Sequence, residues 1–291
     1  MRTQQEMFDL ILGVAEKDER IRAVYMNGSR TNPNVPKDIF QDYDIVYVVR
    51  QNKPFYEDKS WIDRFGERLY MQCPDEVDRW NGLPTDFDAC YGWLIQFKDG
   101  NRMDLHVVPC EKADVRSDKL CVILLDKDGI LPAIDAPTDR DYWIQKPSEP
   151  EFWACCNEFW WCLNNLAKAL WRKELLAVHQ SFYGLCQPQL IKMLDWKAGN
   201  DNGFCISTGK ASKYLNRYLP ETVWNRLLET FIGADLEKAW DSAFALCELF
   251  DDIARELSEK WGYRYNTEEA HTSYGFLKHV RTLPQDVKNI F

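Results

Sequence analysis

Two carboxylates beside an apolar run are the residues of this sequence whose types and spacing most favour chemistry. Asp42 and Asp44 stand two positions apart, and the run that follows them ends at Val49. Because successive side chains of a β-strand point to opposite faces, both carboxylates would share one face, with their Cα atoms about 6–7 Å apart. Like charges this close repel each other unless a cation lies between them, and hard oxygen ligands suit Mg²⁺.

A glycine–serine turn precedes these carboxylates. Residues 21–26 form a short β-branched and aromatic run, which predicts a strand leading into Gly28 and Ser29. The backbone N–H groups and the hydroxyl of such a turn can hold phosphate oxygens, and glycine allows close approach. The alternative is a plain turn with both aspartates in solvent, a setting that Asp favours. Turn and carboxylates together predict a phosphate-handling metal site.

A third carboxylate follows on a predicted hairpin. Residues 93–98 and 102–108 are strand-like runs joined through Asp99-Gly100-Asn101, a sequence typical of hairpin turns. Asp104 alternates with apolar neighbours in the second run, so it faces away from them in mid-strand, where an unpaired carboxylate is costly. A bound metal explains this position; the alternative is a buried carboxylate satisfied by hydrogen bonds.

The motif order Gly-Ser, Asp-x-Asp, third carboxylate resembles the DNA polymerase β-like nucleotidyltransferases. A longer series of blocks runs in order along nearly the whole chain: Gly-Ser-Arg-Thr-Asn (28–32), Gln-Asp-Tyr-Asp (41–44), Phe-Gly-Glu-Arg-Leu (65–69), Met-Asp-Leu (103–105), Leu-Asp-Lys-Asp (125–128), Cys-Asn-Glu-Phe-Trp (156–160), Arg-Lys-Glu-Leu (172–175) and Gly-Lys-x-x-Lys-Tyr-Leu (209–215). This ordered set resembles the aminoglycoside 6-adenylyltransferases, the streptomycin-modifying enzymes. It is far more specific than the first motif alone.

The resemblance implies transfer of AMP from ATP, with one or two Mg²⁺, to a hydroxyl of a cationic aminoglycoside, with the 6-hydroxyl of streptomycin as the expected acceptor. Asp42 and Asp44 are the expected metal ligands. Asp104 is a third ligand, the general base that deprotonates the hydroxyl, or both. Ser29 is expected to contact a phosphate oxygen, and Arg30 either offers a bidentate donor to the triphosphate or is simply exposed.

The same resemblance implies a triphosphate-binding role for lysines in the second half of the chain, because in that family lysines of a helical domain reach the triphosphate. Lys213 fits this role somewhat better than Lys210, and the alternative for either is a solvated helix N-terminus. Lys168 has the same ambiguity. The leading glycine of a Walker loop is missing, so no P-loop is predicted. Candidates for drug contacts by residue type alone are Glu67, Asp88, Glu158, Trp160, Glu174 and Trp196.

The elements that must position these residues are read from periodicity and turn signals. Apolar residues at helical spacing predict an amphipathic helix over 3–19, which would cover the first strand. A helix is also expected over 60–71, with Ser60 as N-cap and Asp63 in a capping box. Residues 33–40 and 73–90 are expected to be loops, and residues 118–125 fit a helix or a strand equally well.

The pattern beyond residue 138 predicts helices only. Ser148 and Glu151 form a capping box ahead of an apolar helix, and further helices are expected over 174–197, 211–230 and 235–262. The predicted fold is therefore α/β (α+β): a nucleotidyltransferase domain over 1–138, with a mixed sheet flanked by helices, then an all-α helical bundle over 139–291. The substrate is expected to bind between them.

Composition narrows the partners and the compartment. A formal net charge of −10 disfavours a nucleic-acid substrate and suits a polycationic small molecule. The 10 cysteines include no C-x-x-C pair, and the 4 histidines lack zinc-ligand spacing, so reduced thiols in a cytoplasm are expected. No signal peptide or membrane-spanning run is predicted.

Two other functions share some of these features. One is a nucleotidyltransferase that acts on another small molecule or on a protein, which would have the same motifs. The other is a non-catalytic binding module with the same fold. An intact set of three carboxylates disfavours the binding module, because such a protein has no need to hold three like charges together.

Overall fold

The computed structural model describes residues 1–291 and divides into two compact units, Met1–Asp141 and Tyr142–Phe291. The expected boundary was 138/139, and the observed one lies at Asp141/Tyr142. The stretch that contains both carries Pro132, Pro137 and Pro147. Proline provides no backbone N–H and disfavours a helical conformation in the residue before it, so regular structure is interrupted there.

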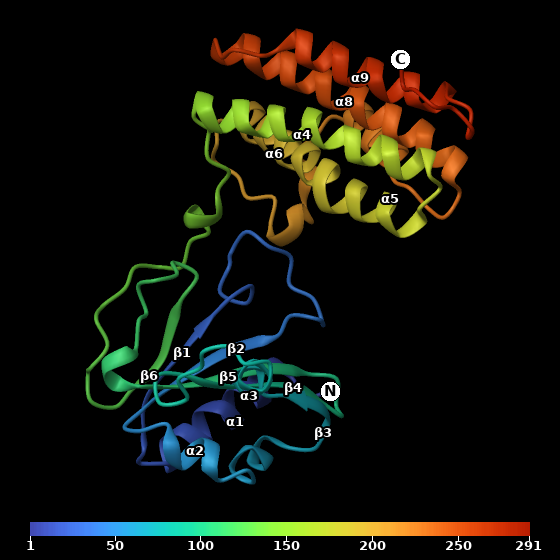
Figure 1. Cartoon of the computed structure of the whole chain (residues 1–291). Helices are drawn as coiled ribbons and strands as arrows, with labels where there is room; N and C mark the ends of the chain where they lie inside the picture. The colour runs from blue at the N-terminus through green and yellow to red at the C-terminus, as the bar shows by residue number, and fades with distance from the viewer. The chain divides into compact units, whose positions relative to one another are not determined.

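The first unit is built on a six-stranded mixed sheet with the order β3-β4-β5-β2-β1-β6 (Figure 1). Strands β2 and β5 pair in parallel, and every other neighbouring pair is antiparallel. The strands are β1 (Ile21–Asn27), β2 (Tyr43–Val49), β3 (Arg68–Gln72), β4 (Tyr91–Phe97), β5 (Arg102–Pro109) and β6 (Val122–Asp126). The predicted first strand, the strand after Asp42 and the hairpin are confirmed. Residues 118–125, left open between helix and strand, contribute the start of β6.

One face of this sheet is covered by helix α1 (Gln4–Lys17) and by α2 (Lys53–Glu57), as Figure 1 shows. Helix α1 is capped by Thr3 and buries Met7, Ile11 and Ala15 completely. Tyr47 reaches through from β2 and donates its hydroxyl to the carbonyl of Ile11 at 2.6 Å. The aromatic core on this face fixes the position of β2 relative to α1.

The opposite face has a smaller apolar cluster at one end. Ala23, Tyr25, Val46, Val48 and Val108 from the central strands pack there against residues of the segment that follows β5. Because side chains alternate along a strand, the same face also carries the carboxylates of β2 and β5. The polar end of this face is therefore supported by apolar packing further along the same strands.

The predicted helix over 60–71 is wrong. Residues Trp61–Phe65 form only a short 3₁₀ helix, η1, which ends at Gly66 with φ at +115°. Ser60 makes no capping bond and instead donates its hydroxyl to Asp58 at 2.6 Å. The following residues become β3, because pairing with the edge of β4 satisfies their backbone groups. The predicted loop over 73–90 is also wrong in part, since it contains α3 (Pro74–Trp80).

The second unit is all helical, as predicted. Its helices are α4 (Glu149–Trp171), α5 (Leu175–Ser181), α6 (Gln187–Asp201), α7 (Glu221–Glu229), α8 (Leu236–Trp261) and α9 (Thr267–Thr282), with a π-helical turn, η4, over Phe182–Cys186. The capping box of Ser148 and Glu151 is confirmed. None of these helices is long and apolar enough to cross a membrane, nor is any in the first unit.

Two helix predictions in this unit fail locally. The helix expected over 211–230 begins only at Glu221, because Lys210–Ser212 and Leu215–Arg217 are short 3₁₀ turns, η5 and η6, and Pro220 precedes α7. Helix α9 was not predicted at all, although Asn266 caps its first turn. The remaining short 3₁₀ turns are η2 (Cys110–Lys112) and η3 (Arg140–Tyr142).

Aromatic stacking joins α4 to α8 in the core of the helical unit. The rings of Phe159 and Phe250 lie parallel with their centroids 3.7 Å apart, and both residues are fully buried. Trp160 packs edge-on against each of them. All three residues belong to the buried core of the helical unit.

Replacement of Phe159 should therefore destabilise the helical unit strongly. We expect Phe159→Ala to lower its free energy of unfolding by about 3–5 kcal/mol, because a buried ring leaves a cavity. Trp153→Ala on the same helix is the control, since Trp153 is 48% exposed and its loss should cost about 0.5 kcal/mol or less. Urea titration followed by circular dichroism measures both; equal losses would contradict the assigned core.

Candidate active site

The parallel pairing of β2 with β5 brings the predicted carboxylates together. Asp44 and Asp104 are register partners across this pair. Asp42 lies directly before β2 on the same face as Asp44. One carboxylate oxygen from each of the three residues lies within 4.8 Å of the others. The three aspartates named from the sequence thus form one cluster on one face of the sheet.

Gly28 makes room for this cluster. Its φ of +78° is in the left-handed region, and a Cβ at this position would lie 2.0 Å from Oδ2 of Asp44. The neighbouring Asn27 is the register partner of Asp44 across β1 and β2. A side chain at position 28 would therefore displace a carboxylate, which explains why glycine stands there.

Ser29 lies in a turn that is closed by hydrogen bonds from Thr31 to Gly28. The backbone N–H and the hydroxyl of Thr31 both donate to the carbonyl of Gly28, at 3.1 and 2.8 Å. The side-chain amide of Gln41 donates to the carbonyl of Ser29 at 3.1 Å and approaches its hydroxyl at 3.5 Å. Since Gln41 directly precedes Asp42, this contact links the glycine–serine turn to the carboxylate cluster.

Arg30 braces the same segment. Its guanidinium donates to the carbonyls of Gln41 and Asp42 at 2.7 and 2.9 Å, and it lies 3.7 Å from the ring centroid of Tyr43. These donors serve the backbone in this structure, so the contact of Arg30 with a triphosphate stays a prediction. Its observed role is to hold the entry to β2 in place.

Arg102 is the site residue that sequence reasoning missed. Its guanidinium donates to both carboxylate oxygens of Asp104, at 2.9 and 2.6 Å, and its Nε lies 3.8 Å from Oδ2 of Asp42. The signal was present in the sequence, because Arg102 stands two residues before Asp104 on the same strand and must share its face. This cation offsets part of the negative charge of the cluster.

The pKa of Asp44 is raised to about 7. Burial is the main cause, followed by the charges of Asp42 and Asp104, while Arg102 and Arg30 act in the opposite direction. Carboxylates are ligands that Mg²⁺ prefers. The donor set, with its oxygens within 4.8 Å of one another, is therefore of the kind that holds a divalent cation, which would relieve the repulsion.

The predicted lysines belong to the second unit. Lys210 and Lys213 are exposed and lie in and beside η5, where Ala211 and Ser212 have left-handed φ values of 57° and 53°. The Nζ of Lys213 lies 5.0 Å from the ring centroid of Tyr214. Their surroundings are thus a compact loop rather than the helix start that was expected. Lys168 is also exposed, near the end of α4.

The residues considered as drug contacts divide by burial. Trp160 and Trp196 are 2% and 6% exposed, so they contribute to the helical core and offer little open surface for a ligand. The acidic candidates are exposed: Glu67, Asp88, Glu158 and Glu174. Of these, Glu67 pairs with Lys98, and Asp88 accepts a hydrogen bond from Tyr56.

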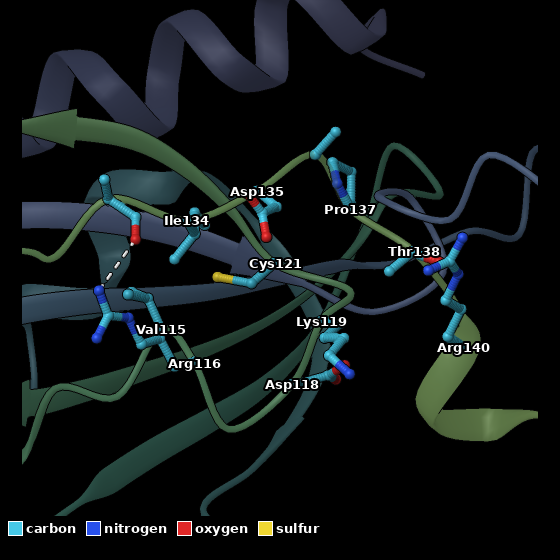
Figure 2. Close-up of a pocket in the computed structure, with 12 residues that line it drawn as sticks. Val115, Arg116, Asp118, Lys119, Cys121, Ile134, Asp135, Pro137, Thr138 and Arg140 are labelled. Carbon is cyan, nitrogen blue, oxygen red and sulfur yellow. Dashed lines mark hydrogen bonds between the residues drawn. The ribbon is translucent and has the colours of Figure 1, made fainter.

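A separate cavity of about 760 Å³ lies in the first unit, in the segment between β5 and the end of the unit. Figure 2 shows its apolar lining, which includes Val115, Cys121 and Ile134, and the hydrogen bond from Arg116 to the carbonyl of Ala133. None of the three aspartates lines it. The carboxylate cluster is therefore a separate feature from this cavity.

The Gly28 contact can be tested with a matched glycine. We expect Gly28→Ala to abolish most of the thermal stabilisation that Mg²⁺ confers, because the new Cβ displaces Asp44. Gly100→Ala is the control, since Gly100 also has positive φ, at +91°, but open space around its Cβ position. Melting curves with and without Mg²⁺ measure the effect. A Gly28→Ala protein that responds to Mg²⁺ like the control would disprove the steric argument.

The raised pKa of Asp44 should also make the folding stability depend on pH. Between its ordinary value and about 7, the folded chain binds a proton that the unfolded chain does not, so stability falls as the pH rises through this range. Asp44→Asn should therefore become more stable relative to the parent as the pH rises from 5 to 8. At pH 8 without divalent cations, its melting temperature should exceed that of the parent by about 2–4 °C.

The exposed Asp78→Asn in α3 is the control for this pH dependence. Its melting temperature should stay parallel to that of the parent across the range. Addition of Mg²⁺ at pH 8 should shrink the advantage of Asp44→Asn, because the cation replaces the lost proton. Parallel curves for Asp44→Asn and the parent would contradict the electrostatic assignment.

Comparison with known proteins identifies the family. The family model described as streptomycin adenylyltransferase matches residues 1–280. The chain is 37% identical over 278 residues to the aminoglycoside 6-adenylyltransferase of Bacillus subtilis (strain 168), covering 94% of this chain and 97% of that protein. It is 36% identical over 268 residues to the Staphylococcus aureus protein of the same name, covering 91% and 94%.

A solved structure is also similar. It is described as an aminoglycoside 6-adenyltransferase from Bacillus subtilis, is 31% identical, and aligns over 97% of this chain and 100% of that chain with a TM-score of 0.48. Because the family match spans residues 1–280 and the curated relatives align over more than nine-tenths of the chain, this protein belongs to the streptomycin adenylyltransferase family and is an adenylyltransferase.

Proposed function

We propose that this protein transfers AMP from ATP to a hydroxyl of an aminoglycoside, with Mg²⁺ bound at the carboxylate cluster and the 6-hydroxyl of streptomycin as acceptor. Pyrophosphate is the leaving group. The observation that carries this proposal is the convergence of Asp42, Asp44 and Asp104 beside the glycine–serine turn, in a chain whose relatives are named for this reaction.

The three aspartates would hold the cation. Bound there, Mg²⁺ supplies neutralisation of the charge that develops on the phosphate oxygens during displacement. Gly28 and Ser29 lie beside the cluster, where a backbone without a side chain and a hydroxyl suit close contact with a phosphate. Little covalent chemistry is required of the protein, so positioning and electrostatic stabilisation supply the rate.

In this proposal Asp104 accepts the proton of the attacking hydroxyl, holds the cation, or does both. The bidentate contact of Arg102 fixes the plane of this carboxylate. A carboxylate acts as a general base only within hydrogen-bond reach of the proton that it takes, so this role would require the acceptor hydroxyl to bind beside Asp104. Arg102 is thus a positioning residue for Asp104, whether Asp104 acts as base, as ligand or as both.

The acceptor class fits the charge of the chain. A net charge of −10 creates a negative field that attracts polycations such as aminoglycosides and raises their rate of encounter. The same field disfavours nucleic acid as a substrate. Exposed carboxylates, rather than the buried tryptophans, are the groups available to pair with a guanidinium or ammonium.

Pyrophosphate release tests the proposal directly. We expect release from Mg-ATP with streptomycin but not with kanamycin or without acceptor, together with a product heavier by one AMP. Release without dependence on either drug would instead indicate a different acceptor, and no release from protein that binds Mg-ATP would refute the drug assignment.

The cluster is tested in the same assay by Asp42→Ala. Loss of this ligand should lower the turnover number by about 10³-fold or more, because charge stabilisation at the phosphates is removed. Asp78→Ala is the matched control, an exposed aspartate of the same unit that should keep full activity. An Asp42→Ala protein with parental activity would show that the cluster is not the catalytic centre.

A further inference from the structure

Arg102 bridges two of the three aspartates of the carboxylate cluster. It opens β5 two residues before Asp104, so the two side chains share one face of the sheet. Continued by one residue, the parallel register of β2 and β5 places Arg102 opposite Asp42. Its guanidinium donates to both oxygens of Asp104, at 2.9 and 2.6 Å, and its Nε lies 3.8 Å from Oδ2 of Asp42. One cationic side chain therefore contacts carboxylates that belong to two segments.

The guanidinium of Arg30, also near the cluster, is used differently. Arg30 donates to the backbone carbonyls of Gln41 and Asp42, not to carboxylate oxygens. The positive charge of Arg102, by contrast, lies directly against the oxygens of the cluster. A guanidinium in that position reduces the repulsion between like charges, which is the effect that a divalent cation at the same oxygens would have.

The contact of Arg102 with Asp104 is one that the guanidinium can give up. The side chain of Arg102 is 47% exposed, whereas that of Asp104 is 12% exposed. A guanidinium with this access to water stays solvated when it leaves its partner, so an ion pair with an exposed partner is held weakly. Arg22, which pairs with Asp128 in the same unit, is buried and lacks this route.

We propose that Arg102 is a resident counter-ion of the carboxylate cluster: it stabilises the three aspartates when no divalent cation is available, and it competes with such a cation for their oxygens. The reason is that two cations at the same carboxylates repel each other. Arg102 therefore keeps the affinity for a divalent cation low. This inference rests on the proposed function only in taking the cluster as the cation site, and it depends on neither ATP nor the acceptor.

Arg102→Gln tests the competition, because glutamine keeps a hydrogen-bond donor and removes the charge. The probe is Mn²⁺, which takes the same oxygen ligands as Mg²⁺ and whose unbound fraction is measured by electron paramagnetic resonance. We expect the dissociation constant of Mn²⁺ to fall by about tenfold, or about 1.4 kcal/mol. Loss of a residue that merely orients Asp104 as a ligand would weaken binding instead. Equal or weaker binding by Arg102→Gln would overturn the inference.

Melting curves test the other half of the proposal. Without divalent cations, Arg102→Gln should melt below the parent, because the carboxylates then repel each other without their counter-ion. At saturating Mg²⁺ the deficit should shrink, since tighter binding to the folded state adds stability. An equal deficit with and without Mg²⁺ would show that the ion pair is only structural, and the competition would be refuted.

Two further variants separate local charge from other effects. Arg102→Lys keeps the positive charge and should retain most of the low parental affinity for Mn²⁺. Arg68→Gln is the matched control, because it removes the ion pair of Arg68 with Asp63 on edge strand β3, which β4 separates from β5. Its affinity should equal that of the parent. A gain as large as that of Arg102→Gln would indicate a general effect of net charge and would count against the proposal.

Cation binding measured without nucleotide distinguishes this inference from the proposed function. If the parent transfers no AMP but Arg102→Gln binds Mn²⁺ more tightly, the proposed function fails alone. If the parent transfers AMP and Arg102→Gln binds Mn²⁺ no more tightly, the inference fails alone. Absence of Mn²⁺ binding in both proteins would overturn the inference together with the assignment of the cluster as a cation site.

Discussion

The parallel pairing of β2 with β5 is the constraint on which the rest of the first unit depends. Parallel strands need a long connection, and here the chain between them forms α2, η1, β3, α3 and β4 before it returns as β5. The register of this one pair sets Asp44 beside Asp104. The aromatic core under the sheet and the apolar cluster above it hold that register, so packing remote from the carboxylates determines their spacing.

The carboxylate cluster shows how the fold tolerates charge that opposes its own stability. Three acidic groups converge on a partly buried face, and burial together with the repulsion between them raises the pKa of Asp44. Arg102 offsets part of this effect through its ion pair with Asp104. Arg30, whose guanidinium is held by the carbonyl of Gln41, also lowers the pKa of Asp44. A site built in this way gains its function from groups that a purely structural protein would exclude.

The residues of the candidate site were more predictable than the connections between them. Strand alternation predicted that Asp42 and Asp44 share a face and that Asp104 lies opposite its apolar neighbours, because a period of two is fixed by backbone geometry. The parallel register cannot be read from one strand alone. Edge strand β3 was missed because Trp61, Ile62 and Phe65 have helical spacing, and Gly66 ends the helix before Leu69. The loop conformation of residues 209–213 was missed because left-handed alanine and serine carry no sequence signal.

The contact between Gly28 and Asp44 has a consequence for how sequences of this family can diverge. The space of the missing side chain at position 28 is filled by a carboxylate oxygen from position 44. The two positions are therefore coupled: a larger residue at 28 avoids the clash only in a chain that has already shortened the side chain at 44, and it still has to adopt an unfavourable positive φ. Such a chain has given up a carboxylate of the cluster, so the route to losing this glycine passes through loss of the site.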